Sequence, residues 1–371
     1  MTNKEQDVAA ADKGLEGIVA AKTAISYIDG QHGRLFYQGI EINELVEHST
    51  FEETVYLLWH GSFPTAAQLD ELQRELKAQR RLPVELITML HELPKTATPM
   101  EVLRTAVSAL GSFEHDSSST THENLVKQAV RLTAAVATIV AVWERIRTDQ
   151  AVIEPRDDLG HAANFLHMLC GEVPNEQAAK VLDIALILHA DHGLNASTFA
   201  ARVVASTLAD MYSAITAALC ALKGPRHGGA NEQVMRMINE VKTPERGRPY
   251  VQDALAHKHV VMGFGHRVYR ADDPRAIQLR RIAQEVGKAN GNPQWYDVSE
   301  AIAAAMHEAK PDLPINVDFF SASTYAALGI PTDQFTPIFA ISRTAGWTAH
   351  VIESFTNNTR LIRPESVYTG P

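Results

Sequence analysis

Helix-start signals recur along most of this chain and constrain its fold more than any other feature. In a capping box, a threonine accepts from the amide three residues later, where glutamate or glutamine reaches back to the threonine amide. From Thr50 onward the apolar residues also recur with a helical period. Most of the chain is therefore expected to be helical. The segments that fit the box are Thr50–Glu53, Thr65–Gln68, Thr98–Glu101 and Thr120–Glu123, and Pro99 and Pro337 are expected at first helical positions.

A single strand signal precedes the helices. Thr23–Ile28 and Arg34–Tyr37 alternate apolar and polar residues on either side of the stretch Asp29–Gly33. Alternation around a glycine-containing turn is typical of a β-hairpin. The expected fold class is therefore all-α with a short N-terminal β-hairpin. The segments Phe113–His122 and Thr148–Gly160 are expected to form exposed loops.

A histidine follows the most apolar part of the chain. Phe199–Leu222 is apolar on nearly every side and predicts one buried helix. Gly224 and Pro225 end that helix, and His227 follows in a stretch whose glycines leave the backbone open to a ligand. The next helix is expected to begin within Asn231–Val234, where its N-terminus favours an anion. A glycine-rich turn whose histidine caps a carbonyl group fits the stretch equally well.

A locally basic segment occurs further along an acidic chain. It lacks the dinucleotide-binding and P-loop glycine patterns and follows no parallel strand, so neither type of nucleotide loop is expected. The planar fork of arginine suits a phosphate or a carboxylate group. A solvated face, partly neutralised by neighbouring aspartates, is the alternative. The segment comprises Gly263-Phe264-Gly265 followed by His266, Arg267, Arg270 and Arg275.

Two charged residues near the C-terminus have apolar neighbours in sequence. Asp318 lies between Ile315–Val317 and two phenylalanines, so its carboxylate is either partnered or has a raised pKa, and either would suit a general base. An N-cap for the following helix is the simpler interpretation. Arg343 belongs to a long helix expected at Pro337–Phe355, and its guanidinium is expected to face an anion or an internal acid. Arg363 also fits an ordinary surface residue.

His189 and His192 have the spacing of a metal-ligand pair, with Asp191 between them. A zinc site needs at least a third protein ligand, and this spacing arises easily in a chain with 16 histidines. A hydrogen-bonded cluster at a helix end is favoured over a metal site. We therefore expect no metal.

Charge and cysteine content limit the partners and the compartment. A net charge of −10 and a pI of about 5.9 argue against nucleic acid as a partner. The N-terminus lacks the apolar region of a secretory signal, and the most apolar helices carry charges, so no membrane span is expected. Cys170 and Cys220 occur singly in apolar segments, which predicts unpaired buried thiols in a reducing compartment. A cytoplasmic location is expected.

Six motifs in this order and spacing resemble the citrate synthase family, especially its short prokaryotic members and the related 2-methylcitrate synthases. They are HADHGLNAST, GPRHGGANE, GFGHRVYRADDPR, NVDFFSAS, SRTAGW and RLIRPE. The likeness runs from about Gly14 to the C-terminus. It implies a two-domain homodimer, with a large helical domain of residues 1–226 completed by 327–371, and a small helical domain of residues 227–326.

The family joins acetyl-CoA to oxaloacetate and hydrolyses the thioester, releasing citrate and CoA. The resemblance therefore implies an acyltransferase of the tricarboxylic acid cycle that needs neither a metal nor a cofactor, since the CoA thioester is a substrate. The alternative is a 2-methylcitrate synthase that uses propionyl-CoA, or an enzyme with both activities. Gly193 departs from the glutamate that many members carry, which puts only local packing in doubt.

The resemblance also implies a role for each residue that matches a family motif. Asp318 would remove the methyl proton, His227 would hydrogen-bond the thioester oxygen, and His266 would polarise the ketone and deliver a proton. His192, Arg275 and Arg343 would hold oxaloacetate, with Arg363 reaching in from the partner subunit. The expected CoA-binding residues are Arg270, Val261, Gly263 and Gly265.

Overall fold

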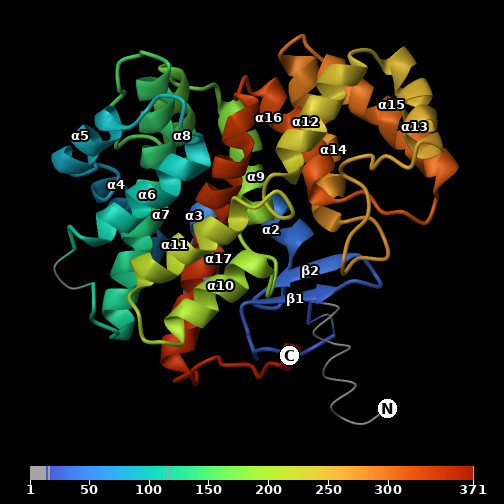
Figure 1. Ribbon diagram of the computed structural model, residues 1–371. Helices are drawn as coiled ribbons and strands as arrows, with labels where there is room; N and C mark the ends of the chain where they lie inside the picture. Colours follow the sequence, from blue (N-terminus) through green and yellow to red (C-terminus); the bar gives the residue numbers. More distant parts are fainter. Residues whose placement is uncertain (1–13, 16, 115–116, 371) are drawn as a thin grey trace.

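The computed structural model describes residues 14–15, 17–114 and 117–370. Helices form most of it, and a small sheet lies near the N-terminus (Figure 1), which confirms the all-α prediction. The α-helices are α2 Ile42–His48, α3 Phe51–His60, α4 Ala66–Ala78, α5 Val84–Glu92, α6 Pro99–Gly111, α7 His122–Arg147, α8 His161–Cys170, α9 Glu176–His189, α10 Ala196–Ala205, α11 Met211–Leu222, α12 Ala230–Val241, α13 Gly247–Ala256, α14 Pro274–Ala289, α15 Gln294–Ala309, α16 Val317–Ala327 and α17 Phe335–Thr356. Short 3₁₀ helices occupy Pro244–Arg246 and Thr332–Gln334.

The predicted hairpin is present and gains a third strand. β1 (Ser26–Asp29) pairs antiparallel with β2 (Arg34–Tyr37), and β2 pairs antiparallel with β3 (Ile40–Glu41). The third strand is only two residues long, which is too short to give a period in the sequence. Gln38 and Gly39, both with positive φ, make the tight turn between β2 and β3.

Three of the four capping boxes form as predicted, at the starts of α3, α4 and α6. The fourth prediction was wrong by one residue. Thr121, not Thr120, caps α7 by accepting from the Asn124 amide. Pro99 begins α6 as expected, whereas Pro337 is the third residue of α17 because that helix begins at Phe335.

The long helix predicted at Phe199–Leu222 is two helices, α10 and α11. Leu208 adopts a left-handed conformation, with φ of 67°, which interrupts the helix. The Asp210 side chain then accepts from the Ser213 amide and caps α11. The helix after His227 begins at Ala230, one residue before the expected range.

Helix α17 runs through the middle of the molecule (Figure 1) and packs against α3, α7, α9, α10 and α11. Every residue from Phe335 to Ile352 is buried. Among the described residues, α7 is the one helix long and apolar enough to span a membrane. Since 89% of its most apolar window is buried inside the protein, α7 is explained as a core helix.

Helices α12 to α16 form a second group beside the first, at the upper right of Figure 1. Within the group, α14 packs against α16, and α13 packs against α15. The group meets the rest of the chain through α14 on α2 and α9, and through α12 on α17. The domain boundaries given above stay a prediction.

The two cysteines differ from expectation in their exposure. Cys170 and Cys220 are unpaired, as predicted, but both are exposed. Each is near the end of a helix, at the last position of α8 and the third-last of α11. An apolar segment therefore did not imply burial of every residue within it, because an amphipathic helix leaves one face at the surface.

Candidate active site

A cavity of about 1000 Å³ opens between the two groups of helices, and the loops that flank α9, α11 and α14 surround it. All three predicted catalytic residues line it, together with three of the four predicted substrate-binding residues. Residues separated by more than a hundred positions in sequence therefore face one space. The predicted residues that line the cavity are His192, His227, His266, Arg275, Asp318 and Arg343.

Asp318 is the second residue of α16 and is half-buried. The interpretation of Asp318 as an N-cap was wrong, since the Asn316 side chain caps the helix by accepting from the Asp318 amide at 3.1 Å. Burial raises the pKa of Asp318 to about 7, although the neighbouring Arg275 guanidinium lowers it. A carboxyl group with such a pKa can gain and lose a proton near neutral pH.

The His266 side chain has a defined tautomer. Its Nδ1 atom accepts hydrogen bonds from the Val268 and Tyr269 amides, both at 3.0 Å. Burial, aided by the Arg275 guanidinium, lowers the pKa of His266 to about 4, so the ring is neutral at pH 7. Its only proton is therefore on Nε2, which makes His266 a neutral hydrogen-bond donor.

His227 contacts a serine that the sequence analysis did not identify. Its Nε2 atom lies 2.8 Å from Ser197 Oγ. The same hydroxyl accepts from the Trp347 indole at 3.1 Å and is 2.7 Å from Oδ1 of the Asn195 side chain, to which it can donate. Burial lowers the pKa of His227 to about 4, so this ring is also neutral. The only signal for Ser197 was its place in a helix-capping cluster, Asn195–Thr198, which gives no hint of a contact with His227.

His192 lies between the two groups of helices and is largely buried. Its Nε2 atom is 3.2 Å from the Tyr269 hydroxyl, and its ring centroid is 5.4 Å from that of His266. Burial, together with the positive charges of Arg275 and Arg343, holds its pKa well below the usual value. His192 is therefore also a neutral group beside His266.

Two buried guanidiniums line the cavity, and they differ in their partners. Arg275 pairs with Asp273 through Nε and Nη2, at 2.9 and 2.6 Å. Arg343 donates from Nε to the His189 carbonyl group at 2.7 Å, lies 4.6 Å from the Phe339 ring centroid and leaves Nη2 without a partner. Burial lowers the pKa of Arg343 to about 10, so it still carries its charge at neutral pH. The sequence prediction that Arg343 faces an anion is consistent with this arrangement.

The other predicted site residues lie outside this cavity. Arg363 is exposed in the segment after α17. Val261 and Gly263 are buried, and a Cβ atom on Gly263 would come within 2.5 Å of the Phe319 ring. The Gly265 amide donates to the Pro314 carbonyl group at 2.7 Å, so these glycines bring their loop close to the start of α16. A role of Val261, Gly263 and Gly265 in CoA binding stays a prediction.

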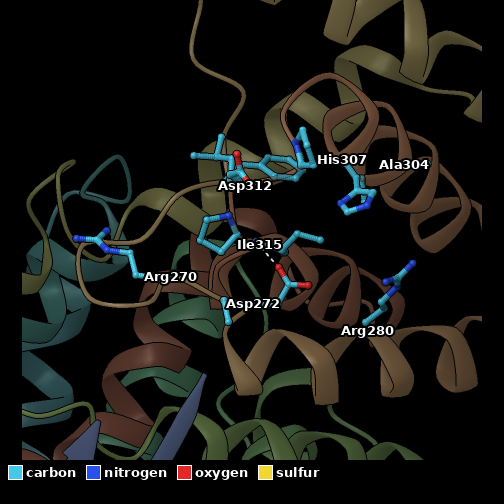
Figure 2. Close-up of a pocket in the computed structure, with 13 residues that line it drawn as sticks. Arg270, Asp272, Arg280, Ala304, His307, Asp312 and Ile315 are labelled. Atoms are coloured by element: carbon cyan, nitrogen blue, oxygen red, sulfur yellow. Dashed lines mark hydrogen bonds between the residues drawn. The ribbon is translucent and has the colours of Figure 1, made fainter. Parts of the chain in front are cut away.

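Arg270 lines a second cavity, of about 570 Å³ (Figure 2). Its walls come from the loop before α14, from residues on α14 and α15, and from the segment between α15 and α16. Arg270 and Arg280 lie on opposite sides of the labelled residues in that view. Between them, Asp272 accepts from the Ile315 amide at 2.9 Å. Arg270 is exposed and so is accessible to a phosphate group.

At His189 and His192 the sequence favours a hydrogen-bonded cluster at a helix end over a metal site. His189 Nδ1 lies 2.7 Å from the Ala185 carbonyl group, as expected for a hydrogen-bonded cluster at a helix end. Within the part of the chain that the structure describes, the one potential ligand group combines His192, His266 and Asp273. Asp273 already pairs with Arg275, and His266 holds its proton on the cavity side, so these residues do not fit a cation well.

Taken together, the fold and the cavity define a class of protein. The cavity combines one carboxyl group of near-neutral pKa, neutral imidazoles and four guanidiniums, of which two are buried. These groups suit acid–base catalysis on an anionic substrate in a helical enzyme.

Comparison with known proteins identifies the family. Residues 14–365 match the family model described as citrate synthase, C-terminal domain. The chain is 47% identical to citrate synthase of Haloferax volcanii over 96% of this chain and 95% of that protein, and 43% identical to 2-methylcitrate synthase of Mycobacterium tuberculosis over 96% and 90%. It also resembles the solved ternary complex of Thermoplasma acidophilum citrate synthase with carboxymethyl coenzyme A and oxaloacetate, with a TM-score of 0.92, 32% identity, and coverage of 97% of this chain and 96% of that one. The chain belongs to the citrate synthase family and is an acyltransferase of that family.

Proposed function

We propose that this chain acts as a citrate synthase, condensing acetyl-CoA with oxaloacetate and hydrolysing citryl-CoA to citrate and CoA. The observation that carries the proposal is the meeting, in one cavity, of Asp318 with neutral His227 and His266 and two buried guanidiniums. The family relatives support the same reaction. We propose that it proceeds without a metal or a cofactor, in the cytoplasm.

The chemistry assigns one role to each group. A thioester methyl is a weak acid, so Asp318 removes its proton while His227 hydrogen-bonds the oxygen on which negative charge develops. The new carbon nucleophile attacks the ketone carbon of oxaloacetate, and the ketone oxygen takes the proton from His266 Nε2. The proton held by Asp318 replaces the one that His266 gave up, which returns both groups to their starting states. Water then attacks the thioester carbon and the bond to sulfur breaks. One water proton goes to the CoA thiolate and the other to solvent, and citrate and CoA leave.

Positive charge holds the second substrate. Oxaloacetate carries two carboxylates, and Arg275, Arg343 and His192 are the groups that bind it in this proposal. Fixing its orientation makes the attack effectively unimolecular. Arg363 reaches the same site from the partner subunit of a homodimer. The Arg343 Nη2 atom, which is buried and unpaired, supports a carboxylate at this position.

The CoA moiety occupies the approach to the cavity. Arg270 contacts its phosphates, and the loop with Val261, Gly263 and Gly265 lies beside it. The second cavity in Figure 2 is next to this loop and has room for part of the nucleotide. Condensation needs water excluded, so we propose that residues 227–326 move as a small domain against residues 1–226 and 327–371.

The pH dependence of the reaction should follow Asp318. Because a base acts in its ionised form, kcat/KM for acetyl-CoA should rise with pH and level off above the pKa of about 7. His227 and His266, with pKa values of about 4, stay neutral and add no second transition near pH 7. Steady-state kinetics over this range test the assignment. A kcat/KM that is independent of pH between about 6 and 8 would contradict it.

Ser197 should control the proton of His227. The indole of Trp347 can only donate, so the Ser197 hydroxyl proton is shared between Asn195 and His227 Nε2. When Ser197 donates to Nε2, Nδ1 carries the imidazole proton and can donate to the thioester oxygen. We expect Ser197→Ala to lower kcat by about tenfold to a hundredfold, the worth of roughly 1–3 kcal/mol from one buried hydrogen bond. The KM for oxaloacetate should stay unchanged, and the matched control is Ser299→Ala, a buried serine of α15 whose hydroxyl donates to the Trp295 carbonyl group.

Thiol release tests the proposed function directly. With acetyl-CoA, oxaloacetate and a chelator present, the protein should release CoA, and omission of oxaloacetate should abolish release. Absence of release with oxaloacetate would overturn the proposal, and loss of activity on chelation would overturn its metal-free form. Both assays are run with the same protein preparation, and metal is added back after chelation.

The alternative is a 2-methylcitrate synthase. The similarity of the chain to the 2-methylcitrate synthase of Mycobacterium tuberculosis supports it. Propionyl-CoA differs from acetyl-CoA by one methylene, and a pocket discriminates such a difference by only about 1–3 kcal/mol. Competition between the two thioesters for the same enzyme gives the ratio of their kcat/KM values. A larger value for propionyl-CoA would replace citrate synthase by this alternative and leave every assigned residue in its role.

A further inference from the structure

The tip of the N-terminal hairpin contacts the loop that carries His266. A Cβ atom on Gly30 would lie 2.4 Å from the Val268 carbonyl oxygen, and one on Gly33 would lie 2.8 Å from that of Asp272. Both distances are too short for a real side chain. The Arg270 amide also donates to the Gly30 carbonyl group at 2.8 Å. The hairpin and the His266 loop therefore approach each other too closely for a side chain at Gly30 or Gly33.

The base of the same hairpin contacts the loop that carries His192. The Tyr37 hydroxyl donates to the Asp191 carbonyl group at 2.8 Å and lies 3.1 Å from the Asp191 amide, which donates to it. Ser26 donates from its hydroxyl to the Asp191 carboxylate and accepts from the Gly193 amide at 3.0 Å. The hairpin thus connects two loops that are far apart in sequence and that present His192 and His266 to the same cavity.

The contact at the tip reaches the imidazole through two peptide groups. The Val268 carbonyl group faces Gly30, and the Val268 amide donates to His266 Nδ1. The Arg270 amide is bound to Gly30, and the preceding Tyr269 amide donates to the same Nδ1 atom. The hairpin tip therefore holds the turn whose two amides keep the His266 proton on Nε2.

We propose that Gly30 and Gly33 are positioning residues for the reaction, which hold the His266 loop so that Nε2–H faces the ketone of oxaloacetate. Neither residue touches the substrate. Gly30 acts on His266 through Val268 and Arg270, and Gly33 holds the later part of the same loop at Asp272. The inference rests on the proposed role of His266. It assigns to the hairpin a part in setting the distance between the loop that carries His192 and the loop that carries His266.

Gly30→Ala is the first test. The backbone of Gly30 does not have a positive φ, so alanine adds only the contact with Val268. The tip should move away, and kcat should fall by about 10- to 100-fold, as for a misplacement of roughly 1 Å near a reacting group. Gln31→Ala, at an exposed position of the same turn, is the control and should behave as the wild type.

Gly33→Ala is the second test, and it has a control of matched backbone strain. Gly33 and Gly39 both have positive φ, of 62° and 83°, and lie in successive turns of the same sheet. A Cβ atom on Gly39 would meet nothing within 4 Å, whereas one on Gly33 would meet the Asp272 carbonyl group. Gly33→Ala should lower kcat about as much as Gly30→Ala, whereas Gly39→Ala should lower thermal stability alone. Equal activity in Gly33→Ala and Gly39→Ala would overturn the inference.

An infrared measurement separates this inference from the proposed function. A hydrogen bond from His266 lowers the stretching frequency of the ketone of bound oxaloacetate, and this signal requires binding but no turnover. In Gly30→Ala the band should move toward that of free oxaloacetate, and in Gln31→Ala it should stay in place. If the wild type is active but the ketone band in Gly30→Ala is the same as in the wild type, the role of the hairpin is contradicted and the proposed function is not. If the wild type shifts the ketone band of oxaloacetate from its free position but releases no thiol, the proposed function is contradicted and the role of the hairpin is not.

Discussion

Asp318→Asn should lower the rate of condensation by about 10²–10⁴-fold while oxaloacetate still binds, because the amide fills the same space but cannot accept the methyl proton. The loss should appear in kcat and in kcat/KM for acetyl-CoA alike. Stopped-flow measurement of thiol release gives the rate, and calorimetry gives the affinity for oxaloacetate. The matched control is Asp297→Asn, an exposed carboxylate in the first turn of α15.

Stability distinguishes this loss of chemistry from a loss of structure. The raised pKa of Asp318 means that the native state holds its proton more tightly than the unfolded state does. Stability therefore falls as the pH rises from the unfolded value of 3.8 toward about 7, and asparagine removes that penalty. Asp318→Asn should be at least as stable as the wild type at alkaline pH. A variant that retains full activity would contradict the assignment of the base.

Local signals in the sequence predicted the helix starts well. The capping boxes at α3, α4 and α6 are complete within four residues, so their geometry follows from the sequence itself. The division of the Phe199–Leu222 segment was missed because it depends on a leucine in a left-handed conformation, for which composition gives no signal. The pair Asp210 and Ser213 could have indicated the second helix start, since the aspartate caps the serine amide.

The site was predictable in its charged groups and not in its supporting contacts. His227, Asp318 and Arg343 stand out because polar residues interrupt apolar segments or follow glycines. Ser197 and Gly30 do not, because each resembles an ordinary helix cap or turn residue. Their contacts join residues that are far apart in sequence, Ser197 with Trp347 and Gly30 with Val268. Such pairs form only in the tertiary fold, so no local sequence pattern predicts them.

Arg343→Met should weaken oxaloacetate binding and should not destabilise the protein. No carboxylate in the described part of the chain forms an ion pair with Arg343, and its Nη2 atom is buried without a partner. Arg343 has no ion-pair partner among these residues, and only the longer-range attraction of buried carboxylates such as Asp191 offsets the burial of its charge. An apolar side chain of similar length should therefore leave stability nearly unchanged. The missing guanidinium should cost about 2–5 kcal/mol of affinity, roughly 30- to 5000-fold. Calorimetry with oxaloacetate and thermal unfolding without ligand measure the two effects.

Arg275→Met supplies the contrast, because the two guanidiniums differ only in their partners. Arg275 is paired with Asp273, and both side chains are buried. Removing the guanidinium leaves that carboxylate unpaired, which should destabilise the protein by about 3–5 kcal/mol, besides weakening oxaloacetate binding. The charge of Arg275 thus serves both the fold and the substrate, whereas that of Arg343 serves the substrate. Equal destabilisation by the two substitutions would mean that Arg343 is compensated within the protein, and the anion site would lose its main support.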